Sequence, residues 1–259
     1  EDTLSLHDAL PIYLFLYRRD RRELMALSAG LRVDNPAISP DGKRVAFEVT
    51  SQGTRRLALM DLPSTERGSD TETVNAKAHA VPEVWRARAA KPVVFPLPQA
   101  EWSQIYTPSW SPDGKLLTFS YWQQGGFRDI VTLNLHTGEL RYITHDRALD
   151  LEPRFSPDGE FVYFSLNGEN ALGRVDVAAQ KLVGKVDVGG GPIQVFVTPN
   201  NKFVLTANQG TKDTPSTTVS VVDVATFQVI ATIETGQGAH GVVIDPSSQY
   251  AYISNIYED

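Results

Sequence analysis

The sequence predicts an all-β fold of repeated four-stranded units, because one turn motif recurs along the chain and strand-like runs surround it. The motif Ser-Pro-Asp-Gly stands at residues 39–42, 111–114 and 156–159, with looser versions at 198–201 and 245–248. Proline presets φ at the second position of such a turn, and glycine ends it without steric cost. The prolines lie at 40, 112, 157, 199 and 246, so successive repeats are 72, 45, 42 and 47 residues apart.

The last three spacings match the roughly 40–50 residues of one β-propeller blade. Each turn precedes a run of alternating or continuous apolar residues, which indicates a strand. These runs are 44–49, 115–121, 160–165, 202–208 and 249–255. One complete blade is predicted from 109–110, 116–121, 130–135 and 140–144, and another from 195–198, 203–208, 218–223 and 229–234. Residues 13–17 and 23–27 are expected to form the outer half of a preceding blade. We therefore predict a β-propeller fragment of about four to five four-stranded antiparallel blades, not a complete ring.

An insert at residues 63–105 accounts for the longest spacing, which exceeds one blade by roughly 25 residues. It begins with the polar stretch 64–70, allows a short helix over 82–90 and continues with the proline-spaced run 92–98. A long loop of this composition either carries recognition or is mobile and energetically neutral. We favour the neutral insertion and leave the functional one open.

Composition excludes several classes of function. The chain has 259 residues with 24 Lys+Arg against 31 Asp+Glu, a formal net charge of −7. This acidic balance, without a basic stripe, argues against nucleic acid or an anionic membrane surface as the main partner. No apolar run reaches the ~18 residues of a spanning helix. Because there is no cysteine, disulfides, thiolate metal sites and a cysteine nucleophile are excluded.

Both ends of the sequence have an unusual character. Residues 2–12 read Asp-Thr-Leu-Ser-Leu-His-Asp-Ala-Leu-Pro-Ile and resemble a sequencing adapter translated in a single frame. We expect residues 1–12 to be such an artefact and exclude them from the interpretation. At the other end, residues 255–259 follow a strand-like run without a closing element. We therefore expect a fragment cut at both ends, whose true start and any signal peptide are missing.

Residues 13–165 resemble the TolB-like family of β-propeller repeats. The matching segments are 35–43 with 45–47, 108–115, and 152–159 with 162–165. The resemblance implies the propeller fold but no particular activity. Such repeats occur in periplasmic envelope proteins and in propellers that precede peptidase domains.

Residues 166–259 resemble the YVTN family of seven-bladed propellers, and they are expected to be truncated at the C-terminus. The matching segments are 174–177, 182–192, 219–224 and 229–233. Residues 251–255, Ala-Tyr-Ile-Ser-Asn, depart from the family signature tyrosine-valine-threonine-asparagine by Ile for Val and Ser for Thr. Residues 155–165 would suit either family. The chain is therefore either a natural mixed propeller or an artificial chimera joined near 165, and both interpretations stay open.

Few residues indicate chemistry. There is no Gly-x-Ser-x-Gly elbow, no phosphate-binding glycine loop and no clustered metal-ligand spacing, so we predict no catalytic residue, no metal and no cofactor. His240 is the weak candidate for a ligand contact, because it directly precedes the predicted inner strand 242–244 and inner strands line a propeller channel. In related propellers a histidine near this position contacts a metal or haem. No second histidine stands at the matching place in 189–194, so a hydrogen-bonded channel residue is the favoured interpretation.

Other polar residues are expected to have structural positions. Of the remaining four histidines, His7 lies in the adapter-like segment and His79 in the insert. His136 and His145 are expected at solvated turns. Asn208 and Asn255 end equivalent strands and are expected to cap turns through their side chains.

These observations, with the resemblances, predict a non-catalytic binding or scaffold module of the bacterial cell envelope. Its expected partner is an envelope protein or a small ligand at the channel mouth, without nucleic acid and without a transmembrane segment in this fragment. By resemblance alone, the expected location is the periplasm or another extracytoplasmic space. Two alternatives stay open: the accessory propeller of a serine peptidase whose catalytic domain is missing, and a haem- or metal-binding redox propeller.

Overall fold

The computed structural model describes residues 14–18, 23–28, 31–51, 53–63, 71–74, 84–87, 92–95, 97, 103–123, 125–145 and 148–257. Within them the chain is built from β-strands and one short 3-10 helix. It divides into two compact units, Glu1–Leu97 and Pro98–Asp259, which are described separately below. Among these described residues, no helix is long and apolar enough to cross a membrane. The adapter-like residues 1–12 lie outside them, as do His7 and His79.

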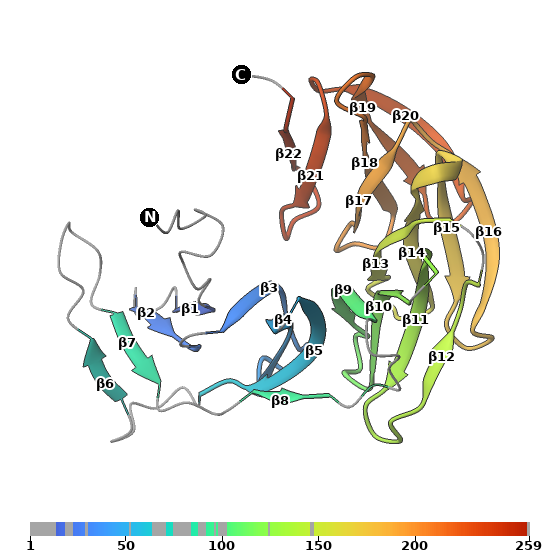
Figure 1. Cartoon of the computed structure of the whole chain (residues 1–259). Helices are drawn as coiled ribbons and strands as arrows, with labels where there is room; N and C mark the ends of the chain where they lie inside the picture. Colours follow the sequence, from blue (N-terminus) through green and yellow to red (C-terminus); the bar gives the residue numbers. More distant parts are fainter. Residues whose placement is uncertain are drawn as a thin grey trace, which may run out of the picture. The chain divides into compact units, whose positions relative to one another are not determined.

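The described residues of the second unit form three four-stranded sheets and one two-stranded sheet (Figure 1). The first sheet consists of β9 (Gln104–Trp110), β10 (Leu116–Trp122), β11 (Arg128–Asn134) and β12 (Leu140–Tyr142). The second consists of β13 (Asp150–Phe155), β14 (Phe161–Leu166), β15 (Ala171–Asp176) and β16 (Lys181–Asp187), with the 3-10 helix η2 (Asn167–Glu169) between β14 and β15. The third consists of β17 (Pro192–Val197), β18 (Phe203–Gly210), β19 (Pro215–Asp223) and β20 (Gln228–Glu234), and the last of β21 (Ala239–Ile244) and β22 (Ala251–Asn255).

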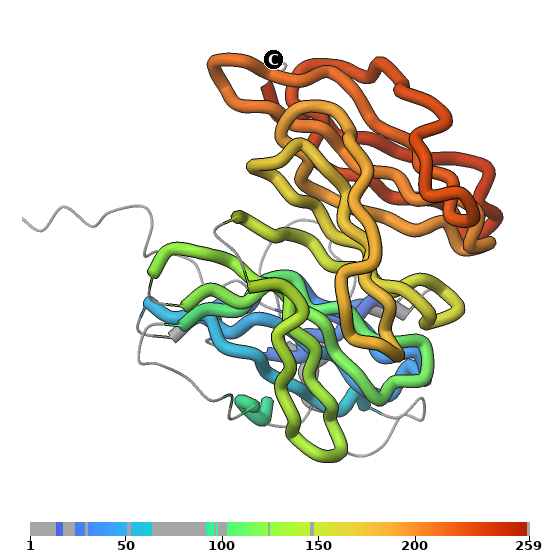
Figure 2. The backbone as a smooth tube through the Cα atoms, turned by 90° about the vertical axis from the view of Figure 1, so that its right-hand side faces the viewer, coloured from blue at the N-terminus to red at the C-terminus, as the bar shows by residue number. Residues whose placement is uncertain are grey.

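Every sheet of this unit is an antiparallel meander in chain order. Successive sheets are stacked one on another, from yellow-green to red in Figure 2. This arrangement confirms the predicted all-β class and the four-stranded blades. The strands that follow each turn motif also lie where the apolar runs predict them, to within about two residues at each end.

The repeated turn is held by side chains of its own motif. In the first copy, Ser39 Oγ lies 2.6 Å from Asp41 Oδ1, and the Gly42 N–H donates to the Ser39 carbonyl at 2.8 Å. Gly42 has φ 68°, a left-handed value that glycine adopts without strain. The same hydroxyl–carboxylate bond recurs in the copies at 111 and 156, and Thr198 bonds Asn200 in the fourth. The motif therefore closes each inner hairpin locally.

The hydrophobic core lies between consecutive sheets. Ile130 packs with Phe155 and Phe164 between the first and second sheets of the unit. Between the second and third sheets, Tyr163 and Leu172 belong to one buried cluster, whose other members are Val195, Val197, Val204, Val222 and Phe227. This second cluster crosses the place near residue 165 where the two family resemblances meet. The two stretches are thus joined by a continuous core.

In the part of the first unit that the structure describes, the strands form two sheets. One has the order β3 (Arg32–Ile38), β4 (Arg44–Ser51), β5 (Thr54–Asp61), β8 (Val93–Val94). The other has the order β1 (Phe15–Arg18), β2 (Glu23–Ala26), β7 (Val84–Ala87), β6 (Thr71–Val74). As predicted, β1 and β2 form an antiparallel pair. However, β2 pairs in parallel with β7, so this sheet departs from the antiparallel pattern predicted for a blade.

The insert at residues 63–105 supplies β6, β7 and β8 to these sheets. The helix expected over 82–90 is therefore wrong for residues 84–87, which form β7. Val84 and Trp85 have strand-favouring side chains, and β2 and β6 provide backbone partners on both sides of β7. Whether the insert carries recognition or is energetically neutral stays a prediction.

Candidate functional site

The first strand of each sheet in the second unit contains a β-bulge. The register shifts lie in β9, β13, β17 and β21. In β9 and β13, Thr107 and Glu152 have φ 52° and 54°, and each directly precedes a proline. A left-handed residue in a bulge turns its side chain out of the regular strand alternation. The inner strands therefore present side chains in directions that an unbroken strand would not allow.

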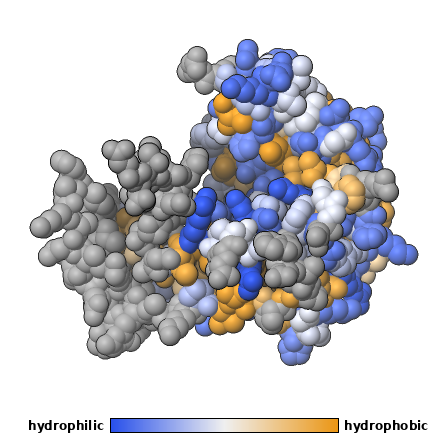
Figure 3. All heavy atoms as spheres, in the orientation of Figure 1, coloured by the Kyte–Doolittle hydropathy of each residue, from blue (hydrophilic) through white to orange (hydrophobic). Residues whose placement is uncertain are grey.

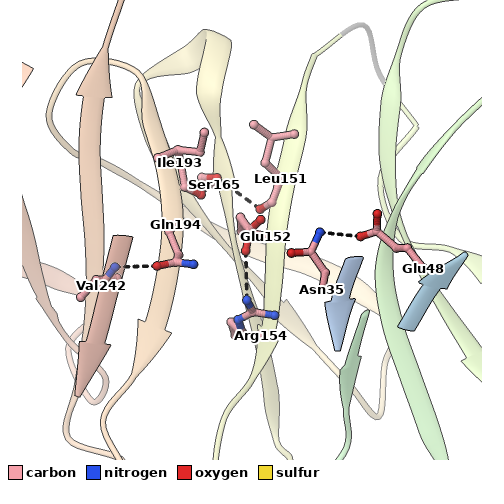
Figure 4. A network of polar contacts seen from close by, with 9 residues as sticks. All are labelled: Asn35, Glu48, Leu151, Glu152, Arg154, Ser165, Ile193, Gln194 and Val242. Atoms are coloured by element: carbon pink, nitrogen blue, oxygen red, sulfur yellow. Dashed lines mark hydrogen bonds and ion pairs between the residues drawn. The ribbon is translucent and has the colours of Figure 1, made fainter. Parts of the chain in front are cut away.

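Glu152 and Arg154 form an ion pair on β13 (Figure 4). Arg154 Nη2 lies 3.0 Å from Glu152 Oε2, and the two side chains are 29% and 17% exposed. The two residues are two apart in sequence, within the bulge between Leu151 and Arg154, and their ion pair shows that both side chains lie on one side of the strand. A guanidinium and a carboxylate that are fixed and partly exposed offer a donor and an acceptor to a ligand.

Gln194 connects β17 with the next inner strand. Its Oε1 accepts the backbone N–H of Val242 at 2.5 Å, so its Nε2 donors remain on the side away from that bond (Figure 4). A Cβ at the neighbouring Gly241 would lie 2.5 Å from Ser254 Oγ, so a larger residue there would displace that hydroxyl. Gln194 thus adds an amide to the same row of inner strands as Glu152 and Arg154.

Two buried serines connect successive sheets through hydrogen bonds to inner strands. Ser165 Oγ lies 2.7 Å from the Ile193 carbonyl and 3.2 Å from the Leu151 carbonyl, and so bridges β13 and β17. Ser120 Oγ donates to the Asp150 carbonyl at 2.6 Å and in the same way joins the first sheet to β13. Both serines are fully buried. They position the inner strands and are not accessible to a ligand.

His240 lies in β21 and is half-buried. Its Nδ1 is 2.8 Å from Gln209 Oε1, and Gln209 Nε2 donates to Tyr257 Oη at 2.9 Å. Because an amide oxygen can only accept, Nδ1 carries the proton in this arrangement, and Nε2 of neutral His240 keeps its lone pair. His240 therefore is hydrogen-bonded, as the favoured interpretation has it, and its contact with a ligand stays a prediction.

The other described histidines do not join this site. His136 is exposed in the turn between β11 and β12, where its backbone N–H donates to Asn134 Oδ1. His145 Nδ1 is 3.7 Å from Asp129 Oδ2, on the first sheet of the unit. Within the described residues, no group of three or more His, Asp or Glu side chains is close enough to hold a metal ion.

The prediction that Asn208 caps a turn is wrong. Asn208 lies inside β18 and is fully buried, and its Nδ2 donates to Thr218 Oγ1 and Ser220 Oγ on the neighbouring strand β19. Gly189, in the connection before β17, makes room for it, because a Cβ there would lie 2.4 Å from Asn208 Nδ2. Both N–H donors of this cross-strand amide have hydroxyl partners on β19, so they are satisfied without a turn.

The first unit has its own bulged inner strand. Asn35, at φ 47°, directly precedes a proline in β3, as Glu152 does in β13. Its Nδ2 donates at 2.7 Å to the fully buried carboxylate of Glu48, which also accepts from Arg55 Nη1 at 2.8 Å. Glu48 thereby fixes the amide of Asn35 (Figure 4).

Sequence reasoning singled out His240 and passed over Glu152, Arg154 and Gln194. The signal that could have located the first two is a polar residue followed by proline shortly before the turn motif, at Asn35, Thr107 and Glu152. Gln194 has no such signal, because its partner is a backbone N–H that lies 48 residues further along the chain.

No protein-family model matches the chain. The Tol-Pal system protein TolB of Francisella tularensis subsp. mediasiatica is 38% identical over 63 residues, which is 24% of this chain and 14% of that protein. The uncharacterized peptidase YuxL of Bacillus subtilis is 26% identical over 152 residues, 52% of this chain and 22% of that protein. The chain thus spans less than a quarter of the length of either relative.

A crystal structure of TolB from Acinetobacter baumannii has the same fold, with a TM-score of 0.63 over 92% of this chain and 53% of that chain, at 20% sequence identity. Together with the antiparallel four-stranded sheets, these similarities confirm a β-propeller fragment whose repeats are related to those of TolB.

Proposed function

We propose that this chain is a non-catalytic binding module of the bacterial cell envelope, that it acts in the periplasm, and that it binds a protein of the Tol-Pal system. The similarity of its repeats to TolB supports the compartment and the class of partner. The half-buried pair of Glu152 and Arg154 on an inner strand supports the place of binding.

The inner strands suit recognition better than catalysis. Glu152, Arg154 and Gln194 supply a carboxylate, a guanidinium and an amide on the inner strands of two successive sheets. Such groups fix the orientation of a bound chain through directed hydrogen bonds, while their partial burial reduces competition from water.

The test is a binding titration of the chain against purified proteins of a Tol-Pal system. The variant is Glu152→Ala combined with Arg154→Ala, and the control is Glu139→Ala combined with Arg141→Ala. The control pair has the same spacing and a 2.7 Å contact, but both of its side chains are more than half exposed on the outer part of the first sheet. We expect the inner-strand variant to weaken binding about tenfold or more and the control to change it little.

Two results would contradict the proposal. One is that none of these proteins binds the chain. The other is that the two double variants weaken binding equally, which would place the contact away from the inner strands.

A second candidate function is the accessory propeller of a serine peptidase, and the similarity to the peptidase YuxL favours it. Long-read sequencing of the source locus, from upstream of Tyr13 to a stop codon beyond Asp259, tests this candidate. A downstream Gly-x-Ser-x-Gly motif in the same frame would support it. The same reads test the join near residue 165, because a chimera would separate there into two genes.

A further inference from the structure

A pocket of about 110 Å³ lies between the first and second sheets of the second unit. Its lining residues, none of them on an inner strand, are Leu116, Thr132, Asn134, Glu139, Arg141 and Gln180. Apolar side chains reach the surface in several places on the face shown in Figure 3, and scattered exposure of this kind is ordinary. The pocket is distinguished instead by what occupies the corresponding space in the next pair of sheets.

Between the second and third sheets, the corresponding space is filled by the ring of Phe227. This residue directly precedes β20, as Gln180 directly precedes β16, and the two have φ 53° and 50°. The Phe227 ring centroid lies 6.1 Å from that of Tyr163 and 4.2 Å from Cζ of the Arg174 guanidinium. A Cβ at Gly184 would lie 2.9 Å from the same ring, so glycine leaves room for it. Phe227 is only 6% exposed.

The pocket exists because the equivalent positions carry smaller side chains. Leu116 begins β10 where Phe161 begins β14. Thr132 corresponds to Arg174, because each stands two residues before the partner of that first residue. Gln180 is in the turn between β15 and β16, at the position of the phenylalanine that fills the next space. With leucine, threonine and glutamine in place of two rings and an arginine, the space of one ring is left between the sheets.

Arg141 supplies a guanidinium to this pocket from the fourth strand. It lies on β12 and corresponds to Gly184 on β16, because each pairs with the equivalent residue of the third strand. Its Nε donates to Glu139 Oε1 at 2.7 Å, and its Nη1 donates to Gln180 Oε1 at 2.9 Å. The N–H groups of a guanidinium lie in its plane. These two bonds therefore fix the plane and leave its faces for stacking.

We propose that the pocket binds one planar aromatic ring with a polar edge, the chemistry of a phenol. The ring takes the place that Phe227 has in the next pair of sheets and stacks on the guanidinium of Arg141, which is a favourable arrangement for arginine. The carboxylate of Glu139 accepts a hydrogen bond from the hydroxyl of the phenol. A closed apolar cavity of roughly 150 Å³ holds benzene. The present pocket is smaller but open beside Arg141, whose side chain is half exposed, so it accommodates a single ring.

The test is a titration with p-cresol, followed by saturation-transfer NMR. We expect a dissociation constant of about 1–10 mM, which is ordinary for so small a ligand. Gln180→Phe places a ring in the pocket and should abolish binding, and the backbone at that position suits phenylalanine, as Phe227 shows. The matched control is Lys185→Ala, which removes a cation of β16 that is paired with Glu169 at 2.8 Å and does not line the pocket. It should leave the dissociation constant unchanged.

Two further variants test the stacking on Arg141. Both Arg141→Ala and Arg141→Lys should weaken binding about threefold or more, because lysine keeps the charge but has no planar face. Absence of p-cresol binding would overturn the proposal. So would unchanged binding by a folded Gln180→Phe variant or, if that variant does not fold, by Arg141→Ala.

A second ligand distinguishes the source of the ring. The peptide Gly-Gly-Tyr-Gly-Gly carries the same phenol on a polypeptide chain. Binding of the peptide as tight as that of p-cresol would assign the pocket to a tyrosine side chain of a partner protein. Binding of p-cresol alone would assign it to a free small molecule.

Discussion

Ser165 shows how much a single buried hydroxyl contributes where two sheets meet. It bridges the inner strands β13 and β17, and it lies within the stretch that suits both family resemblances. The alanine variant removes the donor and leaves two part-buried carbonyls with one partner fewer. We therefore expect Ser165→Ala to lower the free energy of unfolding by about 1–3 kcal/mol, measured by urea denaturation.

The matched control is Ser254→Ala. Ser254 holds the equivalent place on β22, nine residues after the turn motif begins, but it is exposed. Water replaces its hydroxyl bonds, so we expect a change of less than about 0.5 kcal/mol. Equal losses for the two variants would show that Ser165 does not act through the strands it bridges.

Among the individual elements, the hairpins whose turn motif contains aspartate have a stability that depends on pH. The Ser247 hydroxyl and the Tyr250 backbone N–H hold the pKa of Asp245 at about 2, below its ordinary value of 3.8. The Ser39 and Ser111 hydroxyls likewise lower the pKa of Asp41 and Asp113. A carboxyl group whose pKa is lower in the folded state stabilises that state at higher pH. This contribution is lost as the pH falls from about 4 towards 2.

We expect Ser247→Ala to raise the pKa of Asp245 and to lower the urea midpoint at neutral pH. The difference from the parent protein should shrink as the pH falls towards about 2, because both proteins then lose the carboxylate. The control uses proteins that carry Asp245→Asn. In them, adding Ser247→Ala should no longer change how the urea midpoint depends on pH. If the two urea midpoints differed by the same amount at every pH, the prediction would be wrong, because Ser247 would then not act through the charge of Asp245.

At the scale of the whole molecule, shared cores should make the sheets of the second unit unfold together. Leu172 is fully buried in the cluster that crosses from the second sheet to the third. Leu172→Ala should cost about 2–5 kcal/mol. Because each sheet shares its core with the next, we expect one transition rather than two.

Two probes distinguish these outcomes. With Trp85 and Trp102 replaced by Phe, fluorescence reports on Trp110 and Trp122 in β9 and β10, while circular dichroism follows all strands. Leu172→Ala should shift both melting curves equally, and Val183→Ala, at an exposed position on β16, should shift neither. If Leu172→Ala left the melting temperature measured by fluorescence unchanged, the sheets would unfold independently.

The all-β class, the repeated blades and their turns can be predicted from the sequence alone, because each depends on residues that are close in the chain. Proline, aspartate and glycine in that order favour a tight turn, and alternating apolar residues indicate the strand that follows. The contacts between side chains of different sheets, in contrast, become visible only in the folded chain. Ser165 bonds a carbonyl 28 residues away and Gln194 a backbone N–H 48 residues away. Residues 84–87 became a strand because β2 and β6 offered backbone partners. Such choices depend on neighbours distant in sequence, which no local pattern can specify.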